Sequence, residues 1–333
     1  MVDELFSAGE ALDDADEALR SGHRAASKVF PTGFGLLDTY LGGGLRGGEL
    51  CLLGGPQGLG KTAFVLQVAR HAATVDEAVV VMSYEHDATT LLERLITIEA
   101  GDTFGVDGTA MRRVRDALEG AGPRQATLAE RLLPTVGGAE AVSALRSYGH
   151  RLLLHRSSGT ATGVAEIRAV LESAIARSGR APLVIVDYLQ KIYVSGQLTD
   201  DEQAGEVVAG LKDIALEFDV PVLAVAAAEM TGLEPGRRLR VNHLRGSATL
   251  AYEPDVILIM NEMVDVVARH HLVYDTRAID RYRDYVVLSI EKNRSGLAKI
   301  DLKLRKRLDQ SRFERELEGV TEDLVDERLN QST

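Results

Sequence analysis

The stretch that decides the fold is GPQGLGKT, from Gly55 to Thr62, which lies between the apolar run ELCLLGG and the amphipathic segment AFVLQVARHAA. A strand that leads into a glycine-rich turn and then into a helix is the setting of a phosphate-binding loop. The glycines let backbone N–H groups converge on phosphates at the positive end of the helix. Lys61 supplies a point charge for the β and γ oxygens of a nucleotide, and the Thr62 hydroxyl is a ligand for Mg²⁺. The expected cofactors are therefore ATP and Mg²⁺.

Two acidic residues follow other apolar runs and complete the predicted site. Asp187 ends PLVIVD, and because ligands bind at the carboxyl edge of a parallel sheet, we expect it to hold Mg²⁺ through water. Glu85 ends VVVMSYE and is expected to orient and deprotonate the attacking water. Alternatively, Glu85 caps the helix that begins near Ala88, a role open also to His86 and Asp87. The predicted nucleotide contacts are Gly55, Pro56, Gln57, Gly58, Leu59, Gly60, Lys61, Thr62, Ala63 and Asp187.

Short β-rich runs alternate with helical segments from Glu49 onward, which predicts an α/β fold: a mainly parallel twisted sheet with helices on both faces. The run Ala298–Lys306 alternates polar and apolar residues after the turn residues Ser295 and Gly296, so it is expected to form an antiparallel hairpin with the strand before it. Residues 101–150 hold several short helical patterns. The predicted strands are Glu49–Leu53, Ala78–Tyr84, Arg151–His155, Leu183–Asp187, Val220–Ala226, Asp255–Met260 and Tyr285–Glu291.

Both ends of the chain are charged and lie outside this pattern. Residues 3–20 place acidic and apolar side chains at helical spacing, and a polar linker follows from Gly22 to Lys28. This arm is either a solvated tail or a segment that docks on a neighbouring subunit. The expected division is an arm and linker over 1–28, an ATPase domain over 29–314, and a charged tail over 315–333 that is helical or frayed.

Composition excludes several classes of protein. No apolar run reaches the roughly 18 to 20 residues that cross a bilayer, so we expect no membrane partner. The acidic N-terminus lacks the pattern of a signal sequence, and the single cysteine, Cys51, rules out an internal disulfide and is expected in the core; cytoplasmic residence is the default. His270 and His271 adjoin no cysteine or carboxylate at ligand spacing, which favours surface histidines over a metal site.

The charge balance limits contact with nucleic acid to a local surface. A net charge of −12 argues against a protein that coats nucleic acid, because such binding depends on neutralising phosphates with Lys and Arg. One segment, GRRLRVNHLRG from Gly236 to Gly246, is nonetheless basic. Its arginines are the predicted phosphate contacts: Arg237, Arg238, Arg240 and Arg245.

Taken in order, the motifs resemble the C-terminal ATPase domain of DnaB-type replicative helicases, a RecA-like P-loop family. The resemblance runs from about Pro31 to Glu314. PTGFGLLDTYLGGGLRGGEL is similar to the family's segment before the phosphate loop, GKTAF to the loop itself, VVVMSYE to the strand with the catalytic glutamate, and VIVDYLQKI to the magnesium strand. VPVLAV, LRGSATLAYEPDVILIM, EKNRSG and QSRFE follow in the family's order.

The resemblance implies further roles. In EKNRSG, Lys292 and Arg294 match the basic pair that such rings insert into the ATP site of the adjacent subunit, where the arginine stabilises charge on the γ-phosphate. In LRGSATL, Arg245 and Gly246 match the loop that grips the backbone of single-stranded DNA. Phe313, in QSRFE, either packs near the adenine or anchors the last strand. A homo-oligomeric ring, expected to be a hexamer, follows from the resemblance.

Three departures from the family pattern matter. Ala227 stands where a glutamine that senses the γ-phosphate is expected, and an apolar residue there cannot transmit the nucleotide state to the DNA loop by hydrogen bonding. The segment YVSGQLTDDEQ, after the magnesium strand, is acidic and a poor partner for DNA. We expect the acidic arm to stand in place of the family's separate N-terminal domain, which argues against a host's main replicative helicase.

The sequence is compatible with two main functions. The first is a DnaB-like motor that hydrolyses ATP, threads single-stranded DNA and acts in a phage, plasmid or accessory DNA replication system, with a protein loader or recruiter as a possible further partner. The second is an ATP-gated scaffold or regulator with the same ring chemistry and no movement on DNA, which Ala227 and the acidic charge favour. Strand exchange of the RecA kind is a third, weaker alternative, because VIVDYLQKI and EKNRSG are closer to the helicase group.

Overall fold

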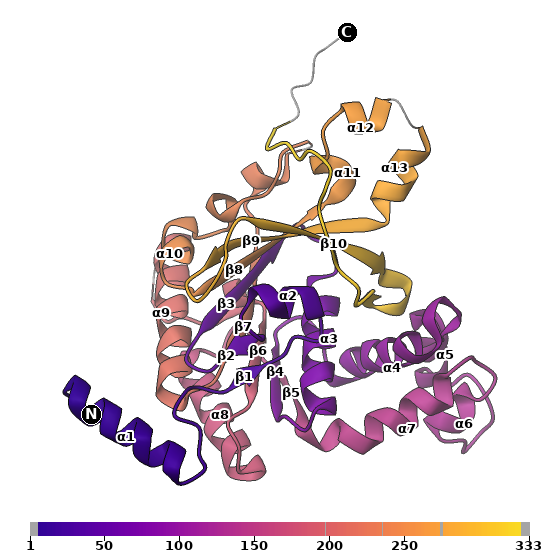
Figure 1. Cartoon of the computed structure of the whole chain (residues 1–333). Coiled ribbons are helices and arrows are strands. Elements are labelled where there is room, and N and C mark those ends of the chain that lie inside the picture. Colours follow the sequence, from indigo (N-terminus) through magenta and orange to yellow (C-terminus); the bar gives the residue numbers. More distant parts are fainter. Residues whose placement is uncertain (1–5, 197, 235, 274–275, 328–333) are drawn as a thin grey trace.

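A single central sheet carries the architecture of the chain (Figure 1). The computed structural model describes residues 6–196, 198–234, 236–273 and 276–327. The strand order is β11-β10-β9-β8-β3-β7-β6-β4-β5, with β12 also paired to β10. The strands are β3 (Leu50–Gly55), β4 (Val79–Ser83), β5 (Leu152–Arg156), β6 (Leu183–Asp187), β7 (Val222–Ala227), β8 (Val256–Glu262), β9 (Tyr285–Asn293), β10 (Ile300–Arg307), β11 (Arg312–Phe313) and β12 (Glu318–Gly319).

The strands from β8 to β5 in that order are parallel, and the pairings beyond β8 are antiparallel, so the predicted α/β fold with an antiparallel hairpin is confirmed. Every residue of β3, β4 and β6 is buried, as expected for apolar runs covered on both faces. The register places Gly55 opposite Ala227 and Ser83 opposite Asp187. The carboxyl ends of β3, β4, β6 and β7 therefore meet at one edge of the sheet.

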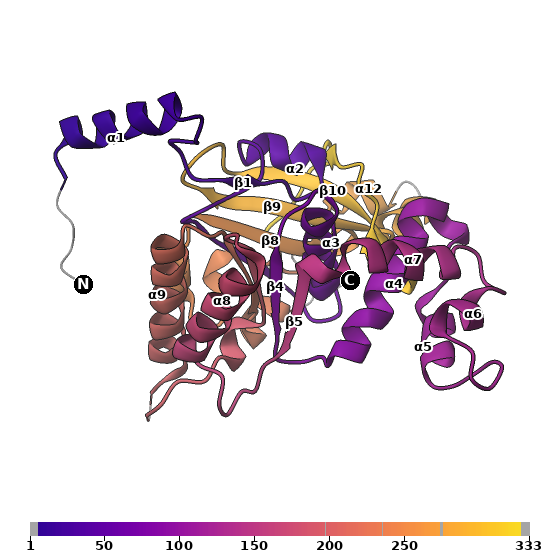
Figure 2. The ribbon, with the colours of Figure 1, turned by 90° about the horizontal axis from the view of Figure 1, so that it is seen from below.

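Helices cover both faces (Figures 1 and 2). On one face α3 (Lys61–Thr74) packs across the parallel strands, beside α4 (Ala88–Phe104). On the other face lie α8 (Val164–Ser178) and α9 (Asp200–Phe218). The short helical patterns of residues 101–150 form α5 (Met111–Leu118), α6 (Leu128–Leu132) and α7 (Gly138–Tyr148), which pack with α4 around a small core of their own.

A group of short helices lies against the antiparallel side of the sheet. Between β8 and β9 the chain forms α11 (Met263–Val266), α12 (His270–Val273) and α13 (Thr276–Arg283). The remaining short elements are β1 (Val29–Phe30), β2 (Leu45–Arg46), α2 (Gly35–Tyr40) and α10 (Ser247–Tyr252).

The end of the chain differs from the expectation of a helical or frayed tail. Over 315–327 it is extended: β12 pairs with β10, and the Val325 N–H donates to the Val266 carbonyl at 2.8 Å. Two of its acidic side chains pair with a lysine of β10: the Lys303 ammonium lies 3.4 Å from Glu318 and 3.3 Å from Glu322. These contacts hold it on the surface of the domain; residues 328–333 lie outside the described part.

The N-terminal arm forms α1 (Ala8–Arg20), which has no buried residue and lies apart from the rest of the domain (Figures 1 and 2). Ser7 and Glu10 cap it reciprocally, which explains how a short acidic helix begins here. Phe6, Leu12 and Leu19 are more than half exposed. Nowhere in the described part of the chain is a helix long and apolar enough to cross a membrane.

Candidate nucleotide-binding site

The phosphate loop joins β3 to α3 in the predicted conformation. Gly60 is the residue before the helix and has φ +92°, while Gly58 has φ +80°, a backbone region that favours glycine. A Cβ on Gly60 would lie 2.8 Å from Leu308 and 2.9 Å from Phe313, whereas one on Gly58 would meet open space. Lys61 turns its ammonium into the loop and donates to the carbonyls of Gly55 and Pro56, each at 2.7 Å. The loop is thus shaped for an anion at the start of α3.

The magnesium residues predicted from two distant motifs lie side by side. The Thr62 hydroxyl donates to an Asp187 carboxylate oxygen at 2.7 Å, across 125 positions of sequence. Asp187 is 3% exposed, and this burial raises the pKa of its carboxyl above the ordinary value. A hydroxyl and a carboxylate are the hard oxygen ligands that Mg²⁺ prefers beside phosphates, so these residues fit the metal.

Glu85 faces the same space from the end of β4. Its side chain is 40% exposed and lies 3.7 Å from the ammonium of Lys191. The cap of α4 is Asp87, whose carboxylate accepts the Thr90 N–H at 2.8 Å. The capping alternative therefore belongs to Asp87, and Glu85 remains available for water.

A cavity of about 600 Å³ lies among these groups, within the size range of small-molecule sites. One charged residue that lines it was not predicted from the sequence: Arg94 on α4, whose guanidinium donates to the Ser311 hydroxyl at 3.2 Å. No local motif marks Arg94, because its place depends on how α4 packs on the sheet. The other lining residues include Gly55, Gln57, Gly58, Gly60, Lys61, Thr62, Ala63, Glu85, Asp187, Tyr188 and Ala227.

Residues 30–315 match the model of the DnaB-like helicase C-terminal domain family. The chain belongs to this family. Among curated relatives of this DnaB-like domain, the replicative DNA helicase DnaC of Bacillus subtilis (strain 168) is 28% identical over 235 residues, 69% of this chain and 46% of that protein. DnaB of Geobacillus stearothermophilus is 26% identical over 234 residues, again 69% and 46%. The chain thus spans about half the length of these relatives.

Solved structures support the fold assignment. A solved ATPase domain superposes with a TM-score of 0.70 at 22% identity, covering 93% of this chain and 99% of that one. A DnaB-like replicative helicase whose structure was solved with its interactions with primase gives a TM-score of 0.67 at 21% identity, covering 93% and 67%. Both agree with the RecA-like fold of DnaB-type ATPase domains.

The basic pair of the DnaB-like motif lies at the other edge of the sheet. The end of β9 pairs with the start of β8, which pairs with the start of β3. At this edge the Arg294 guanidinium bonds to the Asp255 carboxylate at 3.3 Å, and Asp255 also accepts the Leu50 N–H. The phosphate loop begins at Gly55, roughly 16 Å further along β3 by the rise of a strand. Within one chain, Arg294 and its neighbour Lys292 do not reach the phosphate loop.

The predicted DNA-contacting arginines do not form one free basic surface. Arg238 is 4% exposed and bonds to the Ser289 hydroxyl at 2.9 Å, so it stabilises the domain and corrects the expectation for this residue. Arg245 is 51% exposed and bonds to Asp200, the first residue of α9. The carboxylate partners are Glu234 and Glu327 for Arg237, Asp301 for Arg238, Glu291 and Asp326 for Arg240, and Asp200 for Arg245.

Gly246 lies close to α9, and Ala227 lines the nucleotide cavity. Gly246 has φ +88°, and a Cβ there would lie 2.3 Å from Ala204 on α9, so the DnaB-like loop requires glycine at this point. Ala227 lines the cavity at the end of β7, where the family pattern has glutamine. Its methyl group offers no hydrogen bond to the cavity.

Phe313 and Cys51 are core residues. Phe313 is fully buried against Phe64, edge to face with ring centroids 6.3 Å apart, and Gln67 bonds to both its backbone N–H and its carbonyl. This supports the anchoring alternative over contact with adenine. Cys51 is buried in β3 as expected.

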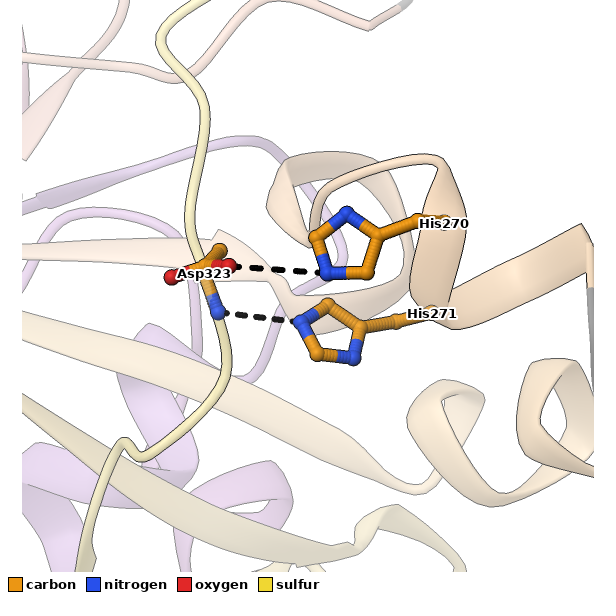
Figure 3. Close-up of side chains that lie close together, drawn as sticks. All are labelled: His270, His271 and Asp323. Atoms are coloured by element: carbon orange, nitrogen blue, oxygen red, sulfur yellow. Dashed lines mark hydrogen bonds and ion pairs between the residues drawn. The ribbon is translucent and has the colours of Figure 1, made fainter.

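The histidine pair has a carboxylate neighbour that its local sequence did not reveal (Figure 3). His270 lies 3.5 Å from an Asp323 oxygen, and His271 Nε2 accepts the Asp323 N–H at 3.1 Å. Because that imidazole nitrogen is already bonded to backbone, the trio fastens the chain end to α12 and is not a ready metal site.

Proposed function

We propose that this chain is an ATP-hydrolysing motor that acts on single-stranded DNA, as a helicase or translocase. The observation that carries the proposal is the convergence of the phosphate loop, Glu85 and Asp187 on one cavity in a DnaB-like domain. Curated relatives are named replicative DNA helicases. ATP and Mg²⁺ are the proposed cofactors, and a role in DNA replication is part of the proposal.

Each residue has a task in this mechanism. Lys61 and the loop N–H groups bind the phosphates, and Thr62 with Asp187 holds Mg²⁺, which supplies charge neutralisation when bound. Glu85 orients water and takes its proton. Arg294, with Lys292, acts in the site of the next protomer, because it lies too far from its own loop. The functional unit is therefore a homo-oligomeric ring, which we propose to be a hexamer.

A second function, an ATP-gated scaffold without movement on DNA, is favoured by the internal pairing of the arginines. Each of the four predicted DNA-contacting arginines already has a carboxylate partner, and the net charge of the chain is −12. In this alternative the same ATP chemistry controls binding of a protein partner.

ATP turnover with and without single-stranded DNA separates the two functions. The variant is Arg245→Glu and the matched control is Arg180→Glu, since Arg245 and Arg180 are 51% and 54% exposed and each pairs with an aspartate that is 60% exposed. The motor predicts stimulation of the wild type and of the control, and loss of it in Arg245→Glu. If single-stranded DNA does not stimulate ATP turnover by the wild type, the motor function is contradicted and the scaffold is favoured.

A further inference from the structure

A glutamine on the turn after β6 connects the nucleotide cavity with the loop that carries Arg245. Gln190 lies three positions after Asp187, in the turn Leu189–Lys191. Its Oε1 accepts the Ala227 N–H at 2.9 Å, and its Nε2 donates to the Arg245 carbonyl at 3.2 Å. The same nitrogen lies 3.5 Å from the Ala227 carbonyl. One side chain therefore hydrogen-bonds to the backbone of two segments at once.

Backbone hydrogen bonds connect the phosphate loop to the Arg245 segment through Ala227. Ala227 pairs in register with Gly55, the first residue of the loop. The Arg245 N–H donates to the Ala227 carbonyl at 3.0 Å, and the Glu229 N–H donates to the His243 carbonyl at 2.8 Å. The Arg245 segment thus extends the sheet by a short antiparallel pairing beside the nucleotide site.

The turn that carries Gln190 also contacts the proposed general base. Lys191 follows Gln190 directly and places its ammonium 3.7 Å from Glu85. A shift of Glu85 or Asp187 on hydrolysis would act on both ends of this turn. Gln190 would then pass the shift to the strand and loop that it holds.

The chemistry of this link requires an amide. Gln190 accepts from an N–H and donates to a carbonyl at the same time, which neither a carboxylate nor a hydrocarbon can do. The side chain of Ala227, by contrast, can transmit nothing by hydrogen bonding.

We propose that Gln190 is a positioning residue that couples the nucleotide state to the Arg245 loop, acting through the backbones of Ala227 and Arg245. It supplies the connection that an apolar residue at position 227 cannot. This inference rests on the proposed function, since it presumes that Arg245 contacts single-stranded DNA.

The test is the ratio of two affinities for single-stranded oligodeoxythymidine, measured on the full chain with a non-hydrolysable ATP analogue and with ADP, both with Mg²⁺. The wild-type ratio is expected at about 5- to 150-fold. Gln190→Leu should bring it to within about twofold of one, because the coupling factor itself is lost. A merely structural role would weaken both affinities together and leave the ratio unchanged.

Gln203→Leu is the matched control. Gln203 is also a half-buried glutamine and lines, with Gln190 and Arg245, a small cavity beside the turn. It donates to the Ile192 carbonyl at 3.3 Å and not to Ala227 or the Arg245 backbone. It should keep the wild-type ratio. Gln190→Glu serves if the leucine variant does not fold: it keeps the length but sets a carboxylate against two carbonyls, so the ratio should also collapse.

The outcomes distinguish this inference from the function on which it rests. A wild type that does not bind the oligonucleotide, or binds it equally in both nucleotide states, defeats the proposed motor. A wild type with a large ratio that Gln190→Leu or Gln190→Glu retains overturns the role of Gln190 and leaves the motor standing.

Discussion

Gly58 and Gly60 share a left-handed backbone but differ in what surrounds them. Gly60 points toward Leu308 and Phe313, and Gly58 points into open space. The phosphate loop thus depends on glycine for conformation at both positions and for room at one.

Alanine at the two positions should therefore have unequal effects on stability. Each substitution places a Cβ in the left-handed region, at about 1–2 kcal/mol. Gly60→Ala adds the contact with Leu308 and Phe313, and overpacking of a core commonly costs about 1–3 kcal/mol more. Urea unfolding of both variants measures the difference; equal free energies of unfolding would show that the core yields to the added methyl group.

Glu85 and Asp87 are two residues apart and have separable roles. Glu85→Gln should still bind ATP but hydrolyse it at least ~100-fold more slowly, because the group that takes the proton is lost. Asp87→Ala removes the cap of α4, so it should lower stability by about 1 kcal/mol and leave turnover close to that of the wild type. Nucleotide binding, steady-state turnover and unfolding are measured on both; full activity in Glu85→Gln would exclude it as the base.

Among the helices, α3 and α4 are joined by a buried ionic network. Arg70 on α3 bonds to Glu99 at 2.5 and 2.8 Å and to Asp102 at 2.7 Å, and the Tyr148 hydroxyl donates to Glu99. Arg70 and Glu99 are 11% and 3% exposed. The network holds the helix that begins at the phosphate loop against the helix that follows Glu85, so it sets the relative position of the two.

Removing Arg70 should be strongly destabilising. Arg70→Leu leaves the buried carboxylate of Glu99 without its cation, and such a loss costs about 3–5 kcal/mol. Asp102 keeps its ion pair with Arg315 at 2.7 Å. The control is Arg168→Leu, which breaks a pair between α8 and α9 whose members are each 33% exposed and should cost at most about 1 kcal/mol. Free energies of unfolding from urea titration measure both. Similar values would mean that the network adds nothing beyond an exposed pair.

For the whole molecule, the sheet separates two halves of one proposed site. The phosphate loop lies at the carboxyl edge and Arg294 at the opposite edge, where Asp255 and the Tyr252 carbonyl hold its guanidinium. Catalysis between protomers requires Arg294 to leave these partners for the next subunit. ATP turnover should therefore depend on assembly.

Mixing two inactive variants tests the shared site. Arg294→Ala should lose about 10³-fold or more in turnover, as expected for an arginine finger, and Glu85→Gln supplies the second inactive chain. After subunit exchange at equal amounts, about a quarter of the interfaces in a head-to-tail ring contain intact copies of both residues. Turnover should rise to a comparable fraction of the wild type. No recovery in rings shown to be mixed would place Arg294 outside the neighbouring site.

The amino-acid sequence by itself determined the strands and the candidate nucleotide-binding residues. The run before Gly55, the loop to Thr62, and the strands that lead to Glu85 and Asp187 were all predictable, because a phosphate loop is local in sequence and a buried parallel strand is a continuous apolar run. Parallel order then brings such strand ends to one edge. The candidate ATP site is therefore predictable from the sequence alone.

The tertiary structure decided what the charged and polar side chains contact. Arg238 is neutralised by Asp301, 63 positions away, and Asp323 meets the histidine pair from 52 positions away. The Gln190 side chain hydrogen-bonds to backbone groups 37 and 55 positions away. Pairings of this kind depend on which segments the topology brings together, and no local pattern encodes them. The same applies to Arg294, whose distance from its own phosphate loop follows from the antiparallel direction of β9.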